Sequence, residues 1–270
     1  MQRVLILGHG GMLGHVVGRH LSEKGYAVKT LSVRFTVGSA DAFFAAVEGV
    51  SPLVVINCIG AITQKAHSRE AMYEANAILP WLLRARLSPG SLLIQPSTDC
   101  VFAGKRGNVD ADSVPDAEDD YGLSKAIGES VRMFGNTLVV RCSIIGPEAS
   151  GPGYGLLGWF TSRVAGSTVE GYSDHLWNGI TSLEWAKLVA DRIESWLTGE
   201  RKGIIPLVQP GTARTHSKAE VLAMIKRLWG VEVGIRVVET LHPRDMTLLP
   251  SEVRKPLQEE LEELRDWYNK

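Results

Sequence analysis

Three features are scarce in this chain: cysteine, net charge and long apolar runs. The three cysteines, Cys58, Cys100 and Cys142, lie far apart and form no Cys-x-x-Cys pair, which is typical of reduced thiols in a cytoplasmic protein. The 29 Lys and Arg residues balance 30 Asp and Glu residues, so no global field favours nucleic acid. No apolar run approaches the roughly 20 residues that cross a bilayer, and a strand predicted from Arg3 leaves no room for a signal peptide. We therefore expect a cytoplasmic protein with neither a membrane nor a nucleic-acid partner.

The sequence also lacks the spacings of a metal site. The seven histidines include no His-Glu-x-x-His pair, so no zinc site is predicted. Six acidic residues lie between Asp110 and Asp120, but without the alternating ligands and glycine turn of a calcium loop. We expect a solvated loop there and no metal. The absence of a Gly-x-Ser-x-Gly elbow argues against a hydrolase of that type.

Apolar strand-like runs alternate with amphipathic helical stretches through the first half of the chain. Strands are predicted at residues 4–7, 26–32, 53–58, 91–95 and 138–142, and helices at 12–24, 41–50, 71–86 and 121–134. Strands that are apolar on both faces and separated by helices indicate a parallel sheet covered on both sides. The sequence thus predicts an α/β fold with a doubly wound parallel sheet, the Rossmann fold.

After Gly146 this rhythm changes. We predict a loop at residues 147–158, helices at 182–197, 217–228 and 256–268, and a strand at 203–208, with Ser217 as a helix N-cap. The acidic last helix is expected to be solvated. These pieces are too irregular for a second Rossmann half. We expect a dinucleotide-binding domain at residues 1–146 and a small C-terminal substrate-binding lobe at 147–270, in a single compact chain.

A glycine-rich segment directly follows the first predicted strand and opens a helix. A pyrophosphate must approach backbone N–H groups at a helix N-terminus, and a Cβ atom would block that approach. The alternative is a tight turn without a ligand. We predict that a dinucleotide cofactor contacts this segment, at Gly8, Gly10, Gly11, Met12, Leu13 and Gly14.

The second predicted strand ends without the acidic residue that binds the ribose 2′-hydroxyl of NAD. Arg34 follows it instead and can pair with a 2′-phosphate. This favours NADPH as the cofactor, while NADH stays open, and an exposed surface arginine is the alternative interpretation.

Tyr121 and Lys125 are four residues apart on one predicted helix, so they share a face. A free tyrosine, with a pKa of about 10, is a poor acid–base catalyst near neutrality. A neighbouring ammonium favours the phenolate and lowers that pKa. Thr98, which follows the fourth predicted strand, would give a second hydrogen bond to a carbonyl oxygen on which charge grows during hydride transfer. Tyr-x-x-x-Lys alone is common, but the order glycine motif, Thr98, Tyr121, Lys125 is specific.

Three segments, Gly-His-Gly-Gly-Met-Leu-Gly, Ser-Thr-Asp-Cys-Val-Phe-Ala-Gly and Tyr-Gly-Leu-Ser-Lys-Ala-Ile-Gly-Glu, resemble the extended short-chain dehydrogenase/reductase superfamily. They are most similar to its dTDP-4-dehydrorhamnose reductase branch. The resemblance implies NADPH-dependent reduction of a keto group on a nucleotide-linked 4-keto-6-deoxy sugar, in polysaccharide biosynthesis. It implies that Thr98, Tyr121 and Lys125 are the catalytic residues.

The resemblance implies further roles for single residues. Cys58, Ile59 and Gly60 would lie along the cofactor together with Tyr121 and Lys125. Asn76 would support the active-site backbone or a water, or be a plain polar helix residue. Residues 141–145 would run beneath the nicotinamide, and 172–181 would contact the sugar nucleotide. Substrate contacts are expected from Ser97, Thr98, Trp177 and Asn178, with core packing as the alternative for Trp177.

Departures from the branch's pattern keep other activities open. Cys100 replaces the usual aromatic residue, and the segment from Trp177 to Thr181 differs from the usual sugar loop, so the sugar and the nucleotide are undetermined. The alternatives are an epimerase or dehydratase with retained NAD, and a non-catalytic nucleotide-sensing regulator. A dehydratase would need a second acid where Cys100 stands. Family members often form homodimers, and an apolar helix face within residues 71–83 could serve.

Overall fold

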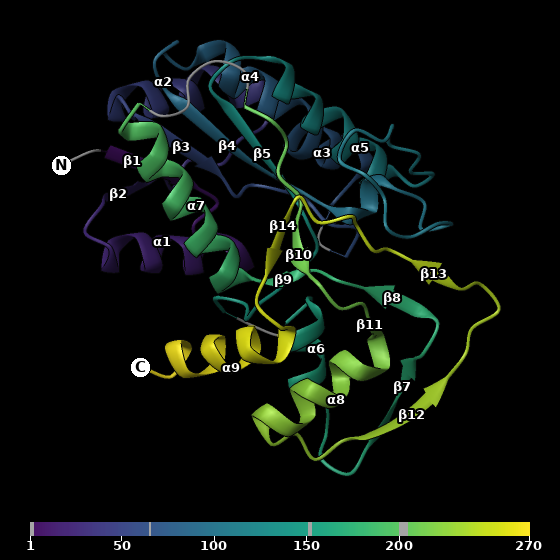
Figure 1. The fold of residues 1–270 in the computed structure, drawn as a ribbon. Helices are drawn as coiled ribbons and strands as arrows, with labels where there is room; N and C mark the ends of the chain where they lie inside the picture. Colours follow the sequence, from purple (N-terminus) through teal and green to yellow (C-terminus); the bar gives the residue numbers. More distant parts are fainter. Residues whose placement is uncertain (1–2, 65, 151–152, 200–204) are drawn as a thin grey trace.

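A five-stranded parallel sheet forms the centre of the structure, a computed structural model that describes residues 3–64, 66–150, 153–199 and 205–270. The strand order is β2-β1-β3-β4-β5, and every neighbouring pair is parallel (Figure 1). The strands are β1 Arg3–Leu7, β2 Ala27–Thr30, β3 Val54–Asn57, β4 Leu92–Ser97 and β5 Thr137–Arg141. The five predicted strands are thus confirmed, with ends shifted by up to two residues.

Helices cover both faces of this sheet. Alternate residues of β1 show the division, because Val4 and Ile6 pack into one core cluster and Leu5 and Leu7 into another. The first cluster includes side chains of helices α1 (Met12–Glu23) and α7, and the second includes side chains of α2 and α4, with α5 packed beside α4. These helices are α2 Ala40–Val50, α4 Leu79–Arg86, α5 Asp120–Glu129 and α7 Ser182–Leu197. The predicted doubly wound fold is confirmed.

The helix predicted at residues 71–86 is helical throughout but changes its winding. It consists of α3 (Arg69–Tyr73), a π-helical turn over Glu74–Ile78, and α4. Single π-turns inside helices are frequently found at functional sites. This one carries Asn76, which the turn places against α5.

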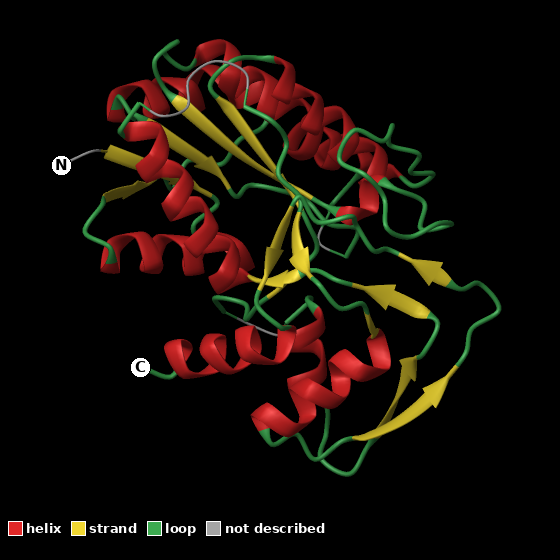
Figure 2. Cartoon of the chain, in the orientation of Figure 1, coloured by secondary structure: helices red, strands yellow, loops and turns green. Residues whose placement is uncertain are grey.

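Short strands and three helices build the C-terminal lobe (Figure 2). The strand pairs are β6 Ile144–Ile145 with β9 Ile180–Thr181, β7 Thr168–Tyr172 with β12 Gly234–Val238, β8 His175–Trp177 with both β11 His216–Ser217 and β13 Arg244–Asp245, and β10 Pro210–Thr212 with β14 Glu252–Arg254. The helices are α6 Leu156–Thr161, α8 Lys218–Trp229 and α9 Leu257–Tyr268. Most of these strands join segments that are far apart in the sequence.

Two predictions in this half need correction. The loop predicted at residues 147–158 ends earlier, because α6 begins at Leu156. Of the strand predicted at 203–208, residues 203 and 204 lie outside the described residues. Residues 205–207 are not in a strand, and Val208 makes only a parallel bridge to Val140. The helix predicted at 217–228 is confirmed as α8, and Ser217 caps it in a capping box with Glu220.

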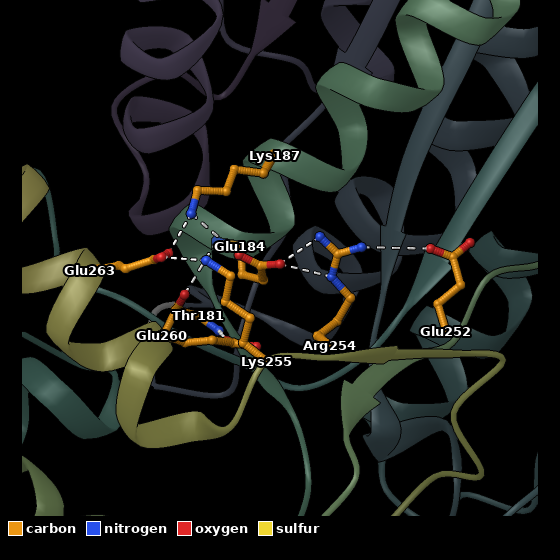
Figure 3. Close-up of polar contacts among 8 residues, drawn as sticks. All are labelled: Thr181, Glu184, Lys187, Glu252, Arg254, Lys255, Glu260 and Glu263. Carbon is orange, nitrogen blue, oxygen red and sulfur yellow. Dashed lines mark hydrogen bonds and ion pairs between the residues drawn. The ribbon is translucent and has the colours of Figure 1, made fainter.

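The last helix, α9, is not the solvated helix that its acidic composition predicts. Its face with Leu257, Leu261 and Leu264 is fully buried. Ion pairs fix its acidic side to the preceding elements, as Glu263 is 2.5 Å from Lys187 of α7 and also pairs with Lys255 (Figure 3). None of the helices in the described part of the chain is long and apolar enough to cross a membrane.

Candidate functional site

Two glycines after β1 are required by close packing. Gly8 has a φ of +73°, which glycine adopts without strain, and an added Cβ would lie 2.7 Å from the Cys58–Ile59 peptide. At Gly14 an added Cβ would lie 2.2 Å from the Gly8 carbonyl oxygen. The turn after β1, the segment after β3 and the start of α1 are therefore in backbone contact.

Gly10 lies in the same turn, yet nothing is within 4 Å of the position of its missing Cβ. Gly10 is exposed, and Gly11, the N-cap of α1, offers no side chain to the first N–H groups of the helix. Uncapped N–H groups at a helix start form a binding site for anions. We call this turn the glycine cradle, because it leaves open space at Gly10 in front of an uncapped helix start.

This cradle lies at the topological switch point of the sheet. From β1 the chain crosses to β2 on one side, whereas β3 lies on the other side of β1. Ligands of open α/β sheets bind in the crevice that forms there at the carboxyl ends of the strands. Ile59 and Gly60 follow β3 into this crevice, and Arg34 follows β2 as an exposed residue.

Thr98, Tyr121 and Lys125 come together at the carboxyl end of β4. Thr98 directly follows β4; its hydroxyl donates to Asp99 Oδ1 at 2.9 Å and accepts from the Cys100 N–H at 3.2 Å. The Tyr121 phenol is close enough to Thr98 for the threonine side chain to lower its pKa. Lys125 Nζ donates to the Pro96 carbonyl oxygen at 2.9 Å, so the end of β4 holds the ammonium of the predicted triad and leads directly into Thr98.

The charges at this site differ from the sequence-based expectation. Burial raises the pKa of Tyr121, and Cys100 adds to the rise, whereas the hydrogen bond to Thr98 lowers it. The expected fall of this pKa beside Lys125 is therefore wrong for this structure. Burial lowers the pKa of Lys125 to about 8, although the Glu129 carboxylate acts in the opposite direction. At neutral pH, Tyr121 is consequently a neutral phenol that can donate a proton, and Lys125 is mostly an ammonium.

Two glycines of α5, which the sequence analysis did not single out, position Tyr121 and Lys125. An added Cβ on Gly122 would lie 2.2 Å from the Cys100 carbonyl oxygen, and one on Gly128 would lie 1.9 Å from that of Asn76. Only a helix without side chains at these two positions can approach both backbones so closely. The signal in the sequence is their placement, one directly after Tyr121 and one three residues after Lys125.

Asn76 connects two walls of the site, as the resemblance led us to expect. Its Oδ1 accepts from the Ala61 N–H at 2.9 Å, and its Nδ2 donates to the Ala61 carbonyl oxygen at 2.8 Å and to Ser124 Oγ at 3.1 Å. Asn76 is 2% exposed, so these bonds are protected from water. The segment that follows Gly60 is thereby tied to the helix that carries Tyr121.

A buried ion pair between Glu129 and Arg141 lies beneath the site. Arg141 Nε is 2.9 Å from Glu129 Oε2, and its guanidinium also donates to Gln209 Oε1 at 2.7 Å. The Ser97 hydroxyl donates to Glu129 at 2.7 Å. Ser97, which we expected at the substrate, thus uses its side chain to bind α5 to β4. The pair connects the sheet to the C-terminal lobe through Gln209.

Trp177 and Asn178, the other expected substrate contacts, are in the interior. Trp177 is 1% exposed and belongs to the core that α1 and α7 share. Asn178 donates to the Leu248 carbonyl oxygen at 2.7 Å and accepts from the Leu248 N–H at 3.0 Å. Both placements favour the packing interpretation over substrate contact. In the described residues, no group of three or more His, Cys, Asp or Glu side chains could hold a metal ion.

Known proteins share parts of this chain. A dTDP-4-dehydrorhamnose reductase of Mycolicibacterium smegmatis is 36% identical over 47% of the chain and 40% of its own length. One from Aggregatibacter actinomycetemcomitans is 30% identical over 48% of the chain and 46% of its own length. The matches thus span less than half of either curated relative. The crystal structure of a Bacillus anthracis dTDP-4-dehydrorhamnose reductase in complex with NADP shares the fold, with a TM-score of 0.82, full coverage of both chains and 20% identity.

The family model described as the RmlD substrate binding domain matches residues 1–154. This range is more than half of the 270 residues and contains the glycine cradle, Thr98, Tyr121 and Lys125. The chain belongs to the RmlD substrate binding domain family.

Proposed function

We propose that this protein reduces a keto group on a nucleotide-linked 4-keto-6-deoxy sugar with NADPH. The observation that carries the proposal is the placement of Thr98, a neutral Tyr121 and Lys125 together at the carboxyl end of β4, at the edge of the sheet that also holds the glycine cradle. The names of the two curated relatives and the NADP bound to the Bacillus anthracis protein support the same reaction.

The chain's own residues account for the proton and the developing charge. When bound, NADPH supplies the hydride that reaches the carbonyl carbon. Tyr121 donates its proton to the carbonyl oxygen, which completes the alcohol, and then regains a proton from solvent. Thr98 donates a second hydrogen bond to this oxygen once its hydroxyl turns from Asp99 to the substrate. Lys125, one turn along the same helix and held by the Pro96 carbonyl oxygen, would orient the nicotinamide ribose.

The test is Tyr121→Phe, which removes the proton donor and keeps the ring. We expect kcat to fall by about 100- to 10,000-fold, the usual contribution of a positioned acid, while the Kd for NADPH stays within a few-fold. Stopped assays with a panel of nucleotide-linked 4-keto-6-deoxy sugars give kcat, and fluorescence titration gives Kd. Turnover close to wild type in the variant would remove Tyr121 from the mechanism.

The alternative functions differ from a reductase in whether the cofactor is consumed. An epimerase or dehydratase regenerates its retained NAD and gives no net absorbance change at 340 nm, whereas a reductase consumes NADPH stoichiometrically. Cys100, which follows Asp99, is not the second acid that a dehydratase would need. A non-catalytic regulator has no use for the Tyr121 and Lys125 pair that this site retains.

The choice of cofactor is also a proposal. Arg34 is exposed four residues after the end of β2, the region where an arginine can pair with a 2′-phosphate, so we propose NADPH over NADH. We further propose that residues 1–146 bind the cofactor and that 147–270 contribute the substrate lobe, apart from α7, which packs on the sheet. The homodimer and the cytoplasmic location stay predictions.

A further inference from the structure

Two buried amide side chains lie between the carboxyl ends of β3 and β4. Asn57, the last residue of β3, is 1% exposed, and Gln95 of β4 is 2% exposed. Asn57 Nδ2 donates to Gln95 Oε1 at 2.8 Å, and Gln95 Nε2 donates to the Pro96 carbonyl oxygen at 3.1 Å. The pairing of β3 with β4 ends at Ile56 and Ile94, so this bond between side chains takes the place of the next pair.

The Pro96 carbonyl oxygen has a second donor, because it also accepts from Lys125 Nζ at 2.9 Å. One oxygen thus receives both the Gln95 amide and the Lys125 ammonium. Among the residues that the structure describes, no carboxylate forms an ion pair with Lys125, so this carbonyl is its anchor. The position of the ammonium therefore depends on where the Pro96 carbonyl points.

The carbonyl also fixes the direction of these hydrogen bonds. A carbonyl oxygen only accepts, so Gln95 must turn its NH2 group to Pro96 and its own oxygen to Asn57. Asn57 must then turn its NH2 group to Gln95. Turning either amide over would set two acceptors against each other. The Gln95 amide therefore has a single orientation while Asn57 and the Pro96 carbonyl are both in place.

This orientation leaves one buried acceptor unmet. Asn57 Oδ1 is buried and has no hydrogen-bond partner in the described part of the chain. An unmet buried acceptor destabilises a protein, and apolar side chains of similar shape would avoid that loss. Val55 and Leu93, two residues earlier on the same face of each strand, are apolar. Stability of the sheet interior thus does not explain the two amides, whereas a fixed anchor for Lys125 does.

We propose that Gln95 is a positioning residue, which holds the Pro96 carbonyl oxygen in place as the anchor of Lys125 Nζ. Asn57 orients the Gln95 amide for this purpose. The inference rests on the proposed function, in which Lys125 orients the nicotinamide ribose. Without the amide, the carbonyl loses one of its two donors and the ammonium is held less precisely. A displaced Lys125 lowers both the affinity for the cofactor and kcat.

The first test separates positioning from stability. Gln95→Leu removes one amide, and Asn57→Leu combined with Gln95→Leu removes both amides and the unmet oxygen. Thr137→Val is the control, since it removes a buried β5 hydroxyl that has no partner in the described residues. We expect both Gln95→Leu and the double variant to weaken NADPH binding by about tenfold in fluorescence titrations, and Thr137→Val to change it by less than about twofold.

Urea unfolding of the same proteins supplies the second measurement. We expect the double variant to be at least as stable as Gln95→Leu, because no buried amide is left without a partner. If the double variant regained both stability and NADPH affinity, Gln95 would act through stability alone and the inference would be overturned. Gln95→Met replaces Gln95→Leu if the latter does not fold.

The second test asks whether Gln95 acts through Lys125. In a protein that already carries Lys125→Met, we expect Gln95→Leu to change the Kd for NADPH by less than about twofold. Effects of the two substitutions that simply multiply would overturn the inference. In wild type, NADPH affinity should fall as Lys125 loses its proton near pH 8. In Gln95→Leu this fall should begin at a lower pH, because a less fixed carbonyl stabilises the ammonium less.

The two proposals fail separately. A wild type that reduces no sugar in the panel, but in which Gln95→Leu and Lys125→Met are coupled in NADPH binding, refutes the reductase alone. A reductase whose kcat and NADPH affinity are unchanged in Gln95→Leu refutes the role of Gln95 alone. A wild type that does not bind NADPH refutes both.

Discussion

The glycines after β1 serve two different purposes that their spacing alone does not separate. Gly14 is needed by the fold, since an added Cβ would lie 2.2 Å from the Gly8 carbonyl oxygen. Gly10 has no such neighbour within 4 Å, and its φ is not in the left-handed region. If Gly10 leaves room for a pyrophosphate, a side chain at this position should weaken cofactor binding and leave the fold unchanged.

We therefore expect Gly10→Ala and Gly14→Ala to separate binding from stability. Gly10→Ala should weaken NADPH binding by about tenfold or more through a clash with the phosphates, while the free energy of unfolding changes by less than about 1 kcal/mol. Gly14→Ala should destabilise the protein by several kcal/mol, on the order of 3, because α1 must move. Fluorescence titration and urea unfolding give the two quantities. Unimpaired cofactor binding by Gly10→Ala would leave the cradle as a tight turn only.

Properties of single residues could be predicted from the sequence where nearby residues determine them, and could not where distant segments do. The face shared by Tyr121 and Lys125 follows from helical spacing, so their placement one turn apart on α5 could be predicted. The pKa of Tyr121 depends on burial beneath distant segments, and its direction was missed. The same holds for Ser97 and Asn178, whose hydrogen-bond partners Glu129 and Leu248 are remote in the sequence.

Among the elements, α9 shows how a charged helix is buried. Glu260 is 1% exposed, and its Oε2 accepts the Thr181 N–H at 2.8 Å, at the start of α7 (Figure 3). Arg254, which binds the neighbouring Glu184 at 2.8 Å through Nε, compensates part of the negative charge. This arrangement could not be predicted from the sequence, because an acidic composition indicates a solvated helix, whereas Arg254 comes from β14 and Thr181 from β9.

The buried carboxyl of Glu260 should make stability depend on pH. Burial raises its pKa from 4.5 to about 8, the Thr181 N–H opposes this, and Glu184 adds to it. The folded state thus holds the proton more tightly, so this group favours folding below pH 4.5, and its contribution is lost as the pH rises to about 8. The loss by pH 7 is on the order of 3 kcal/mol.

Glu260→Gln cannot ionise and keeps an oxygen for the Thr181 N–H. We expect its stability to fall less than that of wild type between pH 5 and pH 8, as measured by urea unfolding at each pH. Glu259→Gln, exposed on the same helix, should behave as wild type. If the free energies of unfolding of wild type and Glu260→Gln changed in parallel with pH, ionisation of the Glu260 carboxyl would not destabilise the folded protein.

For the whole molecule, the strands and helices of the first half could be predicted, whereas in the second half the long helices α7, α8 and α9 could be predicted and the strand pairing could not. Residues 3–141 alternate strand and helix, and each strand pairs within this range in a parallel order that apolar runs indicate. Beyond β5, short strands such as β7 and β12 pair across more than 60 residues, as Thr168 with Gly234. These later strands, such as TVEGY in β7, lack the fully apolar runs of β1 and β3, so their pairing follows from tertiary packing.

One hydrophobic cluster contains residues from both sides of the expected domain boundary at residue 146, which predicts a single unfolding transition. Val4 and Ile6 of β1 share one cluster with side chains of α7 and α9, and Arg141 binds Gln209 across the same boundary. If either part unfolded alone, the apolar side chains of this cluster on the other part would be exposed to water, so we expect both parts to unfold together.

Trp81 is the single tryptophan among residues 1–146, so tryptophan fluorescence reports mainly the later part, whereas far-UV circular dichroism reports both. We expect the two signals to give the same urea midpoint, in wild type and in Trp81→Phe. Midpoints that differ beyond error would mean that the cluster joins two units that fold independently.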